Sequence, residues 1–185
     1  MSEQVKGRSE EKMKKSVAAL QDEFKTVRAG RTSASLFDKI EVDYYGQKTP
    51  LNQIATISVP EARLLVIQPW DKGVLGEIEK AIQTSELSIN PSNDGKVIRI
   101  NIPPLTEDRR KEYVKVAKNM AEQSRVAIRN IRRDANDELK RQQKSGDLGE
   151  DVAKRGAEEI QTLTDSYIER INEAFGVKEQ EILEV

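Results

Sequence analysis

One uninterrupted stretch, from Thr106 to about Lys144, places the strongest limit on what this chain of 185 residues can fold into. It contains neither proline nor glycine, and Gly146 follows it. Thr106 is a good helix N-cap, and Glu107 and Asp108 come next, where the helix dipole favours anions. The stretch therefore predicts one helix of roughly 58 Å at 1.5 Å per residue.

Two other segments, one near each end of the chain, have apolar residues at helical spacing. The first runs from about Glu10 to Ala29, with Gly30 as a C-cap. Its apolar residues are Met13, Val17, Leu20, Phe24 and Val27. The last runs from about Glu150 to Glu184, and its apolar residues are Ile160, Leu163, Tyr167, Ile171 and Ala174. Three long helices with one-sided apolar faces bury those faces best in a three-helix bundle.

Between the first helix and the long one, the apolar pattern changes to that of strands. Strands are predicted over residues 40–44, 57–59, 63–68 and 98–102. Residues 74–84 have helical spacing, and residues 90–95 have the composition of a loop. Trp70, the single tryptophan, follows a predicted strand and is expected to pack against the protein rather than stack on a ligand.

The predicted fold class is therefore α+β. Residues 1–30 and 106–185 form the three-helix bundle, and residues 31–105 form an inserted β/α/β domain. The chain crosses between the two domains twice. Glycine and proline at these crossings predict a hinge of limited freedom, made by Gly30, Arg31, Pro103, Pro104, Leu105 and Thr106.

The absence of cysteine and histidine excludes many kinds of chemistry. No disulfide, thiolate nucleophile or Cys-ligated metal is available, and the commonest general base near neutral pH is missing. No G-x-x-x-x-G-K-[ST] or G-x-G-x-x-G motif is present. We expect no catalytic residue, no metal site and no cofactor, although carboxylates alone can bind magnesium.

The sequence predicts neither a secretory signal nor a membrane span. Residues 1–15 are mostly polar and charged, and the longest apolar runs are far shorter than a membrane span. We expect a cytoplasmic protein that does not enter a membrane.

A formal net charge of −1 conceals an uneven distribution of charge along the sequence. Residues 106–145 carry 12 lysines and arginines against 7 acids, whereas residues 146–185 carry 4 against 11. On the long helix, steps of four and three give one row in which only Glu122 is acidic. We call this row the basic stripe: Lys111, Lys115, Lys118, Glu122, Arg125, Arg129, Arg132, Asn136 and Lys140, flanked by Arg133.

Two interpretations of the basic stripe compete. It is either a solvated face with local ion pairs or a surface for a polyanion. Its centre uses arginine, whose planar fork matches phosphate oxygens, and Arg28 and Arg31 add two more near a domain edge. Few aromatic residues accompany it, which favours structured RNA over single strands.

The basic stripe runs through the segment Ala127-Ile128-Arg129-Asn130-Ile131-Arg132-Arg133-Asp134-Ala135-Asn136-Asp137. This segment is the strongest match in a sequence that resembles the bacterial ribosome recycling factor family. Further matches are Arg28-Ala29-Gly30-Arg31, Tyr44-Tyr45-Gly46, Thr49-Pro50-Leu51, Asn90-Pro91, residues 103–111 and Lys178-Glu179-Gln180-Glu181. One departure is Asp108, where the family usually has glutamate. Two others are Gly156 and Gly176 inside the last helix, where each costs up to about 1 kcal/mol relative to alanine.

The resemblance implies a monomeric, L-shaped, two-domain molecule similar to transfer RNA in outline. It implies binding to the ribosome after the finished polypeptide is released, with the bundle against large-subunit, 23S-type ribosomal RNA. Elongation factor G, which hydrolyses GTP, then acts with the factor to separate the subunits. The resemblance implies no DNA partner.

Carried over to this sequence, Arg129 and Arg132 match the family arginines that face ribosomal RNA. Weaker candidates are Arg28, Arg31, Arg110, Lys118, Arg125 and Arg133. Two alternatives stay open: a helical adaptor whose charged faces bind acidic proteins, and a hydrolase that holds a metal with carboxylates.

Overall fold

The computed structural model describes residues 2–27, 32–87 and 89–184, and the chain divides into two compact units. The helical unit comprises residues 1–28 and 107–182, and the β unit comprises residues 29–106 and 183–185. Long helices and small antiparallel sheets occupy separate stretches of the chain, so the α+β class predicted from the sequence is confirmed.

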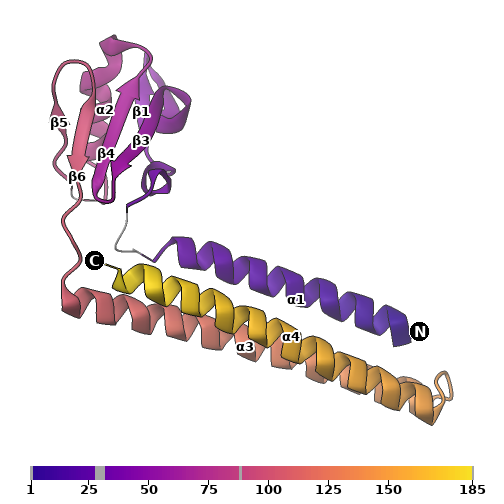
Figure 1. Cartoon of the computed structure of the whole chain (residues 1–185). Coiled ribbons are helices and arrows are strands. Elements are labelled where there is room, and N and C mark those ends of the chain that lie inside the picture. The colour runs from indigo at the N-terminus through magenta and orange to yellow at the C-terminus, as the bar shows by residue number, and fades with distance from the viewer. Residues whose placement is uncertain (1, 28–31, 88, 185) are drawn as a thin grey trace. The chain divides into compact units, whose positions relative to one another are not determined.

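Three long helices make up the helical unit: α1 (Ser2–Lys25), α3 (Glu107–Lys144) and α4 (Glu150–Leu183). They lie side by side (Figure 1). The chain reverses between α3 and α4 at Gly146, whose φ of +83° is in the left-handed region that suits glycine. The amide of Leu148 donates to the carbonyl of Gln142 at 3.0 Å and closes this turn.

The first helix begins at Ser2 rather than near Glu10, so its predicted start is wrong. Val5 and Ser9 are buried and extend the buried row of the helix toward the N-terminus. The polar Ser9 hides this row in the sequence, but its hydroxyl donates to the carbonyl of Val5 at 2.8 Å and is thereby satisfied. α1 ends at Lys25, and the C-cap predicted at Gly30 lies outside the described residues.

The core of the helical unit combines residues from all three helices. Its fully buried side chains include Met13, Leu20, Ala121, Ile128, Tyr167 and Ile171. All five apolar residues predicted for the first helix are buried. α1 packs most closely against α3, where the small side chains of Ala117 and Ala121 let the two backbones approach.

The two glycines inside α4 have different surroundings. A Cβ atom on Gly156 would lie 3.2 and 3.3 Å from the methyl carbons of Leu139 on α3, and 3.6 Å from Cβ of Ser2 on α1. A Cβ atom on Gly176 would meet nothing within 4 Å. Gly156 therefore permits close packing of the helices, whereas Gly176 only lowers the helix propensity of α4.

We expect Gly176→Ala to raise the free energy of unfolding of the helical unit by up to about 1 kcal/mol, because alanine is the better helix former and has room. Gly156→Ala should not give this gain, since its methyl group presses on Leu139. Urea unfolding followed by circular dichroism measures both. An equal gain for the two variants would contradict the packing role of Gly156.

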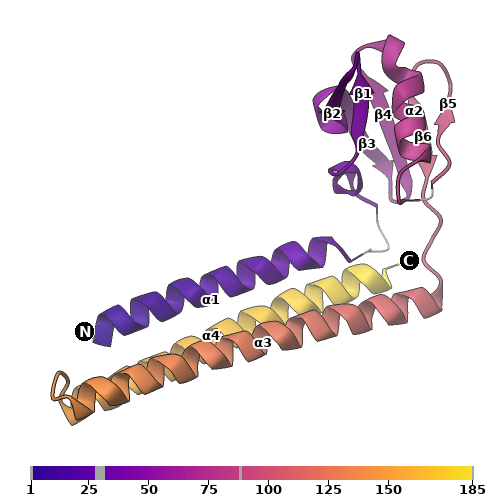
Figure 2. The same ribbon diagram turned by 180° about the vertical axis from the view of Figure 1, so that it is seen from behind.

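The β unit contains a four-stranded antiparallel sheet in the order β3-β4-β6-β5. Its strands are β3 (Ala55–Glu61), β4 (Leu64–Pro69), β5 (Ser92–Asn93) and β6 (Ile98–Asn101). α2 (Leu75–Gln83) lies across one face of this sheet, as Figure 2 shows. Ile78 and Ile82 of α2 are fully buried in one core with Ile67 and Ile100 of the sheet.

A hairpin made by β1 (Glu41–Tyr44) and β2 (Gln47–Pro50) completes the unit, and β2 was absent from the predicted strands. Tyr45 and Gly46 connect the two strands, both with positive φ, as tight hairpin turns require. The segment predicted as a loop around residue 92 contains β5, which pairs with β6. The described part of the β unit also contains short 3-10 helices at Ala34–Phe37, Leu51–Gln53 and Lys72–Val74.

Two features of the β unit differ from the prediction. Strand β3 continues through Pro60, which is possible because β3 is an edge strand and its pairing becomes irregular between Ser58 and Glu61. The expected packing of Trp70 is wrong, because its side chain is 69% exposed. The indole Nε1 donates to Oγ1 of Thr56 at 3.1 Å, so a hydrogen bond to the neighbouring strand holds the side chain at the surface.

None of the helices that the structure describes combines the length and the apolar character needed to span a bilayer.

Candidate nucleic-acid interface

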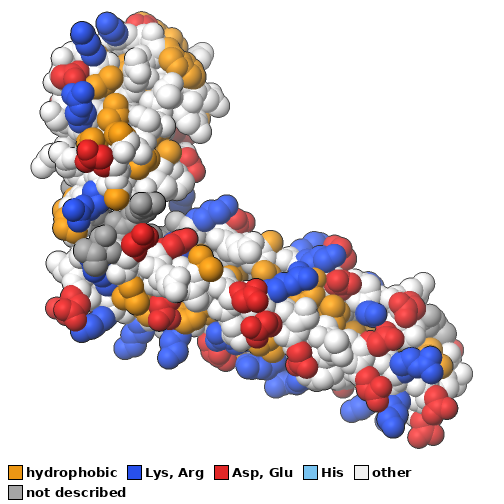
Figure 3. Space-filling view, in the orientation of Figure 1, with side chains coloured by type: hydrophobic (Ala, Val, Ile, Leu, Met, Phe, Trp, Pro, Cys, Tyr) orange, Lys and Arg blue, Asp and Glu red, His pale blue; other side chains and the backbone are white. Residues whose placement is uncertain are grey.

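The basic stripe lies along one flank of α3. The buried row of this helix consists of Ala117, Ala121, Ser124, Ile128, Ala135 and Leu139. The stripe is turned away from this row by about a quarter of the helix circumference at 100° per residue. Lysine and arginine side chains gather along the edge of the helical unit where α3 lies, and acidic side chains gather over α4 (Figure 3).

The two ends of the stripe are exposed, but its centre is half-buried. Lys111, Lys115, Lys118 and Lys140 are exposed, whereas Arg125, Arg129, Arg132 and Asn136 are partly covered. The sequence placed the packing face at Met120, Ala127, Ile131 and Ala135, of which only Ala135 is fully buried. The packing face is therefore rotated toward the stripe, and the central arginines lie at the border between α3 and α4.

Of the arginines in the stripe, Arg125 has the most polar partners among the described residues. Its Nε donates to Oδ1 of Asn172 on α4 at 2.9 Å, and its guanidinium pairs with Glu122 at 3.0 Å. Only 18% of its side chain is exposed. These contacts bind Arg125 to its neighbours and leave it little surface for an external partner.

Arg129 is more open, with 39% of its side chain exposed. One guanidinium nitrogen lies 3.2 Å from Oε1 of Glu122, the carboxylate that also pairs with Arg125. Hydrogen bonds from these two arginines lower the pKa of Glu122 below its usual value.

Arg132 reaches toward α4. A guanidinium nitrogen lies 3.5 Å from Oε1 of Gln161, whose amide nitrogen donates to Asp165 at 2.9 Å. Lys118 and Arg133 are exposed, and the described part of the chain supplies no ion pair or hydrogen bond to either side chain.

Other predicted site residues lie away from the centre of the stripe. Arg110 is in the first turn of α3 and is half-buried, and its Nε has no hydrogen-bond acceptor among the described residues. Arg28, Gly30 and Arg31 lie outside the described residues. Of the other predicted hinge residues, Pro103, Pro104 and Thr106 are exposed and Leu105 is buried, in a segment without regular structure between β6 and α3.

This arrangement suits the recognition of phosphate groups. A guanidinium that uses one or two of its five N–H donors inside the protein can still donate two parallel hydrogen bonds to phosphate oxygens. Arg129, Arg132 and Arg133 fall within one turn and a half of helix, and the exposed lysines extend the same positive flank in both directions. This face of α3 can therefore bind the phosphate backbone of a long polyanion.

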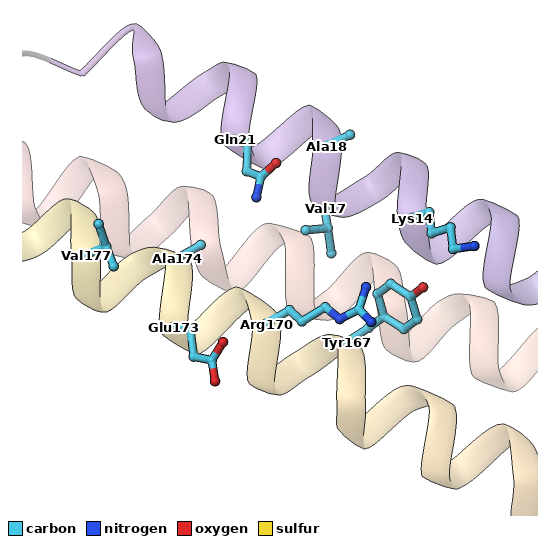
Figure 4. Close-up of a pocket in the computed structure, with 9 residues that line it drawn as sticks. All are labelled: Lys14, Val17, Ala18, Gln21, Tyr167, Arg170, Glu173, Ala174 and Val177. Carbon is cyan, nitrogen blue, oxygen red and sulfur yellow. The ribbon is translucent and has the colours of Figure 1, made fainter.

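A groove of about 420 Å³ between α1 and α4 is a weaker candidate. Val17, Ala18 and Ala174 are among the residues that line it, and the guanidinium of Arg170 lies 4.5 Å from the centre of the Tyr167 ring. Figure 4 shows these side chains along the seam between the two helices. Stacking on the buried ring accounts for the position of Arg170, and the groove is wide open to solvent.

No group of three or more acidic side chains in the described ranges is placed to hold a metal ion.

Of the side chains that contact the arginines of the stripe, the sequence indicates Glu122 but not the two on α4. Glu122 stands three residues before Arg125 and seven before Arg129, so its pairing follows from helical spacing. Asn172 and Gln161 carry no such signal, because their contacts depend on how α4 is placed beside α3.

Comparisons with known proteins identify relatives that match along the whole chain. A family model described as "Ribosome recycling factor" matches residues 20–183. A "Ribosome-recycling factor" of Treponema denticola is 60% identical over 184 residues, which cover all of both chains. A protein of the same name from Bacillus subtilis is 54% identical over 185 residues, again with full coverage of both.

Two solved structures resemble the whole chain as well. A solution structure of a ribosome recycling factor is 42% identical, with a TM-score of 0.78, and the match covers 100% of this chain and 98% of the other. A model of the Thermus thermophilus ribosome recycling factor, described with Escherichia coli elongation factor G on the E. coli post-termination complex, is 46% identical. Its TM-score is 0.66, and the match covers 99% of each chain. The chain belongs to the ribosome recycling factor family.

Proposed function

We propose that this protein binds the post-termination ribosome and, together with elongation factor G and GTP, promotes separation of the subunits and release from messenger RNA. A relative that is 46% identical over nearly its whole length is described with elongation factor G on a post-termination complex. The observation on this chain that best supports the proposal is the partly exposed arginine group at the centre of the basic stripe.

In this proposal the helical unit binds large-subunit, 23S-type ribosomal RNA through the basic stripe. Arg129, Arg132 and Arg133 contact phosphates, because they keep unused donors and exposed surface. Lys118 and the other exposed lysines contribute longer-range attraction. Arg125 acts from within the bundle by fixing the border between α3 and α4.

The role of Arg110 is less direct in this proposal. Its half-buried position in the first turn of α3 favours a contact at the end of the bundle over a contact along the stripe. Arg28 and Arg31 stay candidates for RNA contacts on the strength of the family resemblance alone.

The β unit receives the action of elongation factor G in this proposal, and Pro103, Pro104, Leu105 and Thr106 form part of the hinge. GTP hydrolysis belongs to the partner, as the family resemblance implies, and the absence of a phosphate-binding loop motif from this sequence is consistent with that. The factor acts in the cytoplasm as a monomer.

Interdomain angles measured by residual dipolar couplings test the hinge, and a single fixed angle in solution would contradict it.

Co-sedimentation with purified large ribosomal subunits tests the RNA contact. We expect Arg132→Ala to weaken binding by roughly three- to tenfold at low salt, the effect of one lost charge-assisted contact. Binding of the unaltered protein should fall as salt rises, because phosphate contacts release counterions. Arg155→Ala, which removes an exposed arginine from α4, is the matched control and should change binding less than twofold.

The same preparation tests the function as a whole. Subunits should separate only when the protein, elongation factor G and GTP are all present. Binding to large subunits that does not respond to salt or to Arg132→Ala would favour the adaptor alternative, in which a protein surface is the partner.

A further inference from the structure

Glu122 is the one carboxylate within the basic stripe, and the structure places it between two of the stripe's arginines. Its Oε2 lies 3.0 Å from a guanidinium nitrogen of Arg125, and its Oε1 lies 3.2 Å from one of Arg129. Each oxygen therefore has its own cationic partner. The side chain of Glu122 is 55% exposed, so its ion pair with Arg129 lies at the surface, where an RNA backbone could reach it.

The two arginines depend on Glu122 to different degrees. Arg125 also donates its Nε to Asn172 at 2.9 Å and is mostly buried, so α4 fixes its position without the carboxylate. For Arg129, Glu122 is the single hydrogen-bond or ion-pair partner among the described residues. The carboxylate thus has its largest effect on the arginine that is more accessible.

The other partners of the central arginines are neutral. Asn172 holds Arg125, and Gln161 lies against Arg132. An amide oxygen orients a guanidinium without cancelling its charge, whereas a carboxylate does both. Glu122 is therefore the group at the centre of the stripe that reduces its positive charge.

From these contacts we infer that Glu122 is an internal counter-ion that competes with an RNA phosphate for Arg129 and thereby limits the affinity of the stripe for ribosomal RNA. This inference rests on the proposed function, because it takes the stripe to be the RNA-binding surface. A phosphate that reaches Arg129 must displace Glu122 or bind beside its negative charge. The result is weaker binding and faster dissociation, as a factor that leaves the ribosome after each round requires.

Glu122→Gln isolates the charge, because glutamine keeps the length of the side chain and an acceptor oxygen for the arginines. We expect this variant to bind purified large subunits about three- to tenfold more tightly at low salt, the effect of removing one negative charge near a phosphate. The change should lie mainly in the dissociation rate. The plot of log K against log salt should become steeper by up to about one, since one more phosphate is engaged.

Two control variants separate this effect from general electrostatics. Glu169→Gln removes the same charge from an exposed glutamate of α4, for which the described residues provide no ion pair, and should change affinity less than twofold. In an Arg129→Ala background, Glu122→Gln should lose most of its effect, because the competing arginine is gone. Thermal unfolding of each variant by circular dichroism confirms that the helices remain folded.

The outcomes distinguish this inference from the proposed function. If Arg132→Ala weakens binding but Glu122→Gln leaves it unchanged or weaker, the counter-ion role is wrong and the RNA-binding stripe stands. If Glu122→Gln tightens binding equally with and without Arg129, a general charge effect replaces the specific competition. If the unaltered protein binds large subunits without salt dependence, the proposed function itself fails.

Discussion

Replacing both Arg129 and Arg133 by glutamate is expected to weaken binding to isolated large subunits by at least about a hundredfold at low salt. Each arginine loses a charge-assisted contact of roughly 1–2 kcal/mol, and each new carboxylate repels the phosphates that remain nearby. The two lost contacts sum to about 2–4 kcal/mol, and the repulsion from the two new carboxylates brings the total above the roughly 2.8 kcal/mol that corresponds to a hundredfold change in affinity. Filter binding or sedimentation across a salt series measures the loss.

The matched control is Lys154→Glu with Arg155→Glu, which alters the net charge by the same amount on an exposed part of α4. It should weaken binding by a far smaller factor, because those positions lie outside the basic stripe. Equal losses for the two double variants would mean that net charge, rather than this face of α3, determines binding. The proposed interface would then be wrong.

Tyr167→Ala should lower the free energy of unfolding of the helical unit by about 3–5 kcal/mol, the usual cost of deleting a large buried aromatic side chain. Tyr167 is 1% exposed and packs in the core that joins all three long helices. Its removal leaves a cavity between α1 and α4 and takes away the ring on which Arg170 stacks. Denaturant unfolding followed by circular dichroism measures this change.

Tyr167→Phe separates the ring from its hydroxyl. Among the described residues, the hydroxyl of Tyr167 has one polar contact, a long one of 3.4 Å to Glu10, so this variant should cost less than about 1 kcal/mol. Trp70, the one tryptophan, reports on the β unit by fluorescence, and its transition should not shift in either variant. Similar losses for both variants would show that the hydroxyl, not the buried ring, stabilises the bundle.

The helices of this protein are readable from its sequence because their signals are local. The apolar spacing of α1 and the uninterrupted stretch of α3 predict helices that the structure confirms. The short strands β2 and β5 carry no comparable pattern. Gln47–Pro50 holds no run of apolar residues, and Ser92–Asn93 is wholly polar, so pairing with a neighbouring strand is what makes each of them a strand.

The candidate site follows the same division. Spacing on one helix is enough to align the basic stripe, and it also places Glu122 beside its two arginines. It does not show that the centre of the stripe borders α4, because that depends on which residues of α3 face the core. Ala121 and Leu139 are buried whereas Met120 and Ala127 are only partly buried, so the packing face is rotated from the predicted one, and it includes the polar Ser124.

The assembly of the helical unit from both ends of the chain sets the order in which the protein can fold while it is being synthesised. Translation delivers α1 first, but its buried residues pack with residues that follow the whole β unit: Val5 with Leu139 and Ile160, and Met13 with Ile128 and Tyr167. The β unit is nearly continuous in sequence and can fold earlier. A partly synthesised chain therefore contains a folded β sheet that follows an amphipathic helix, and the apolar face of this helix is still exposed to water and to chaperones.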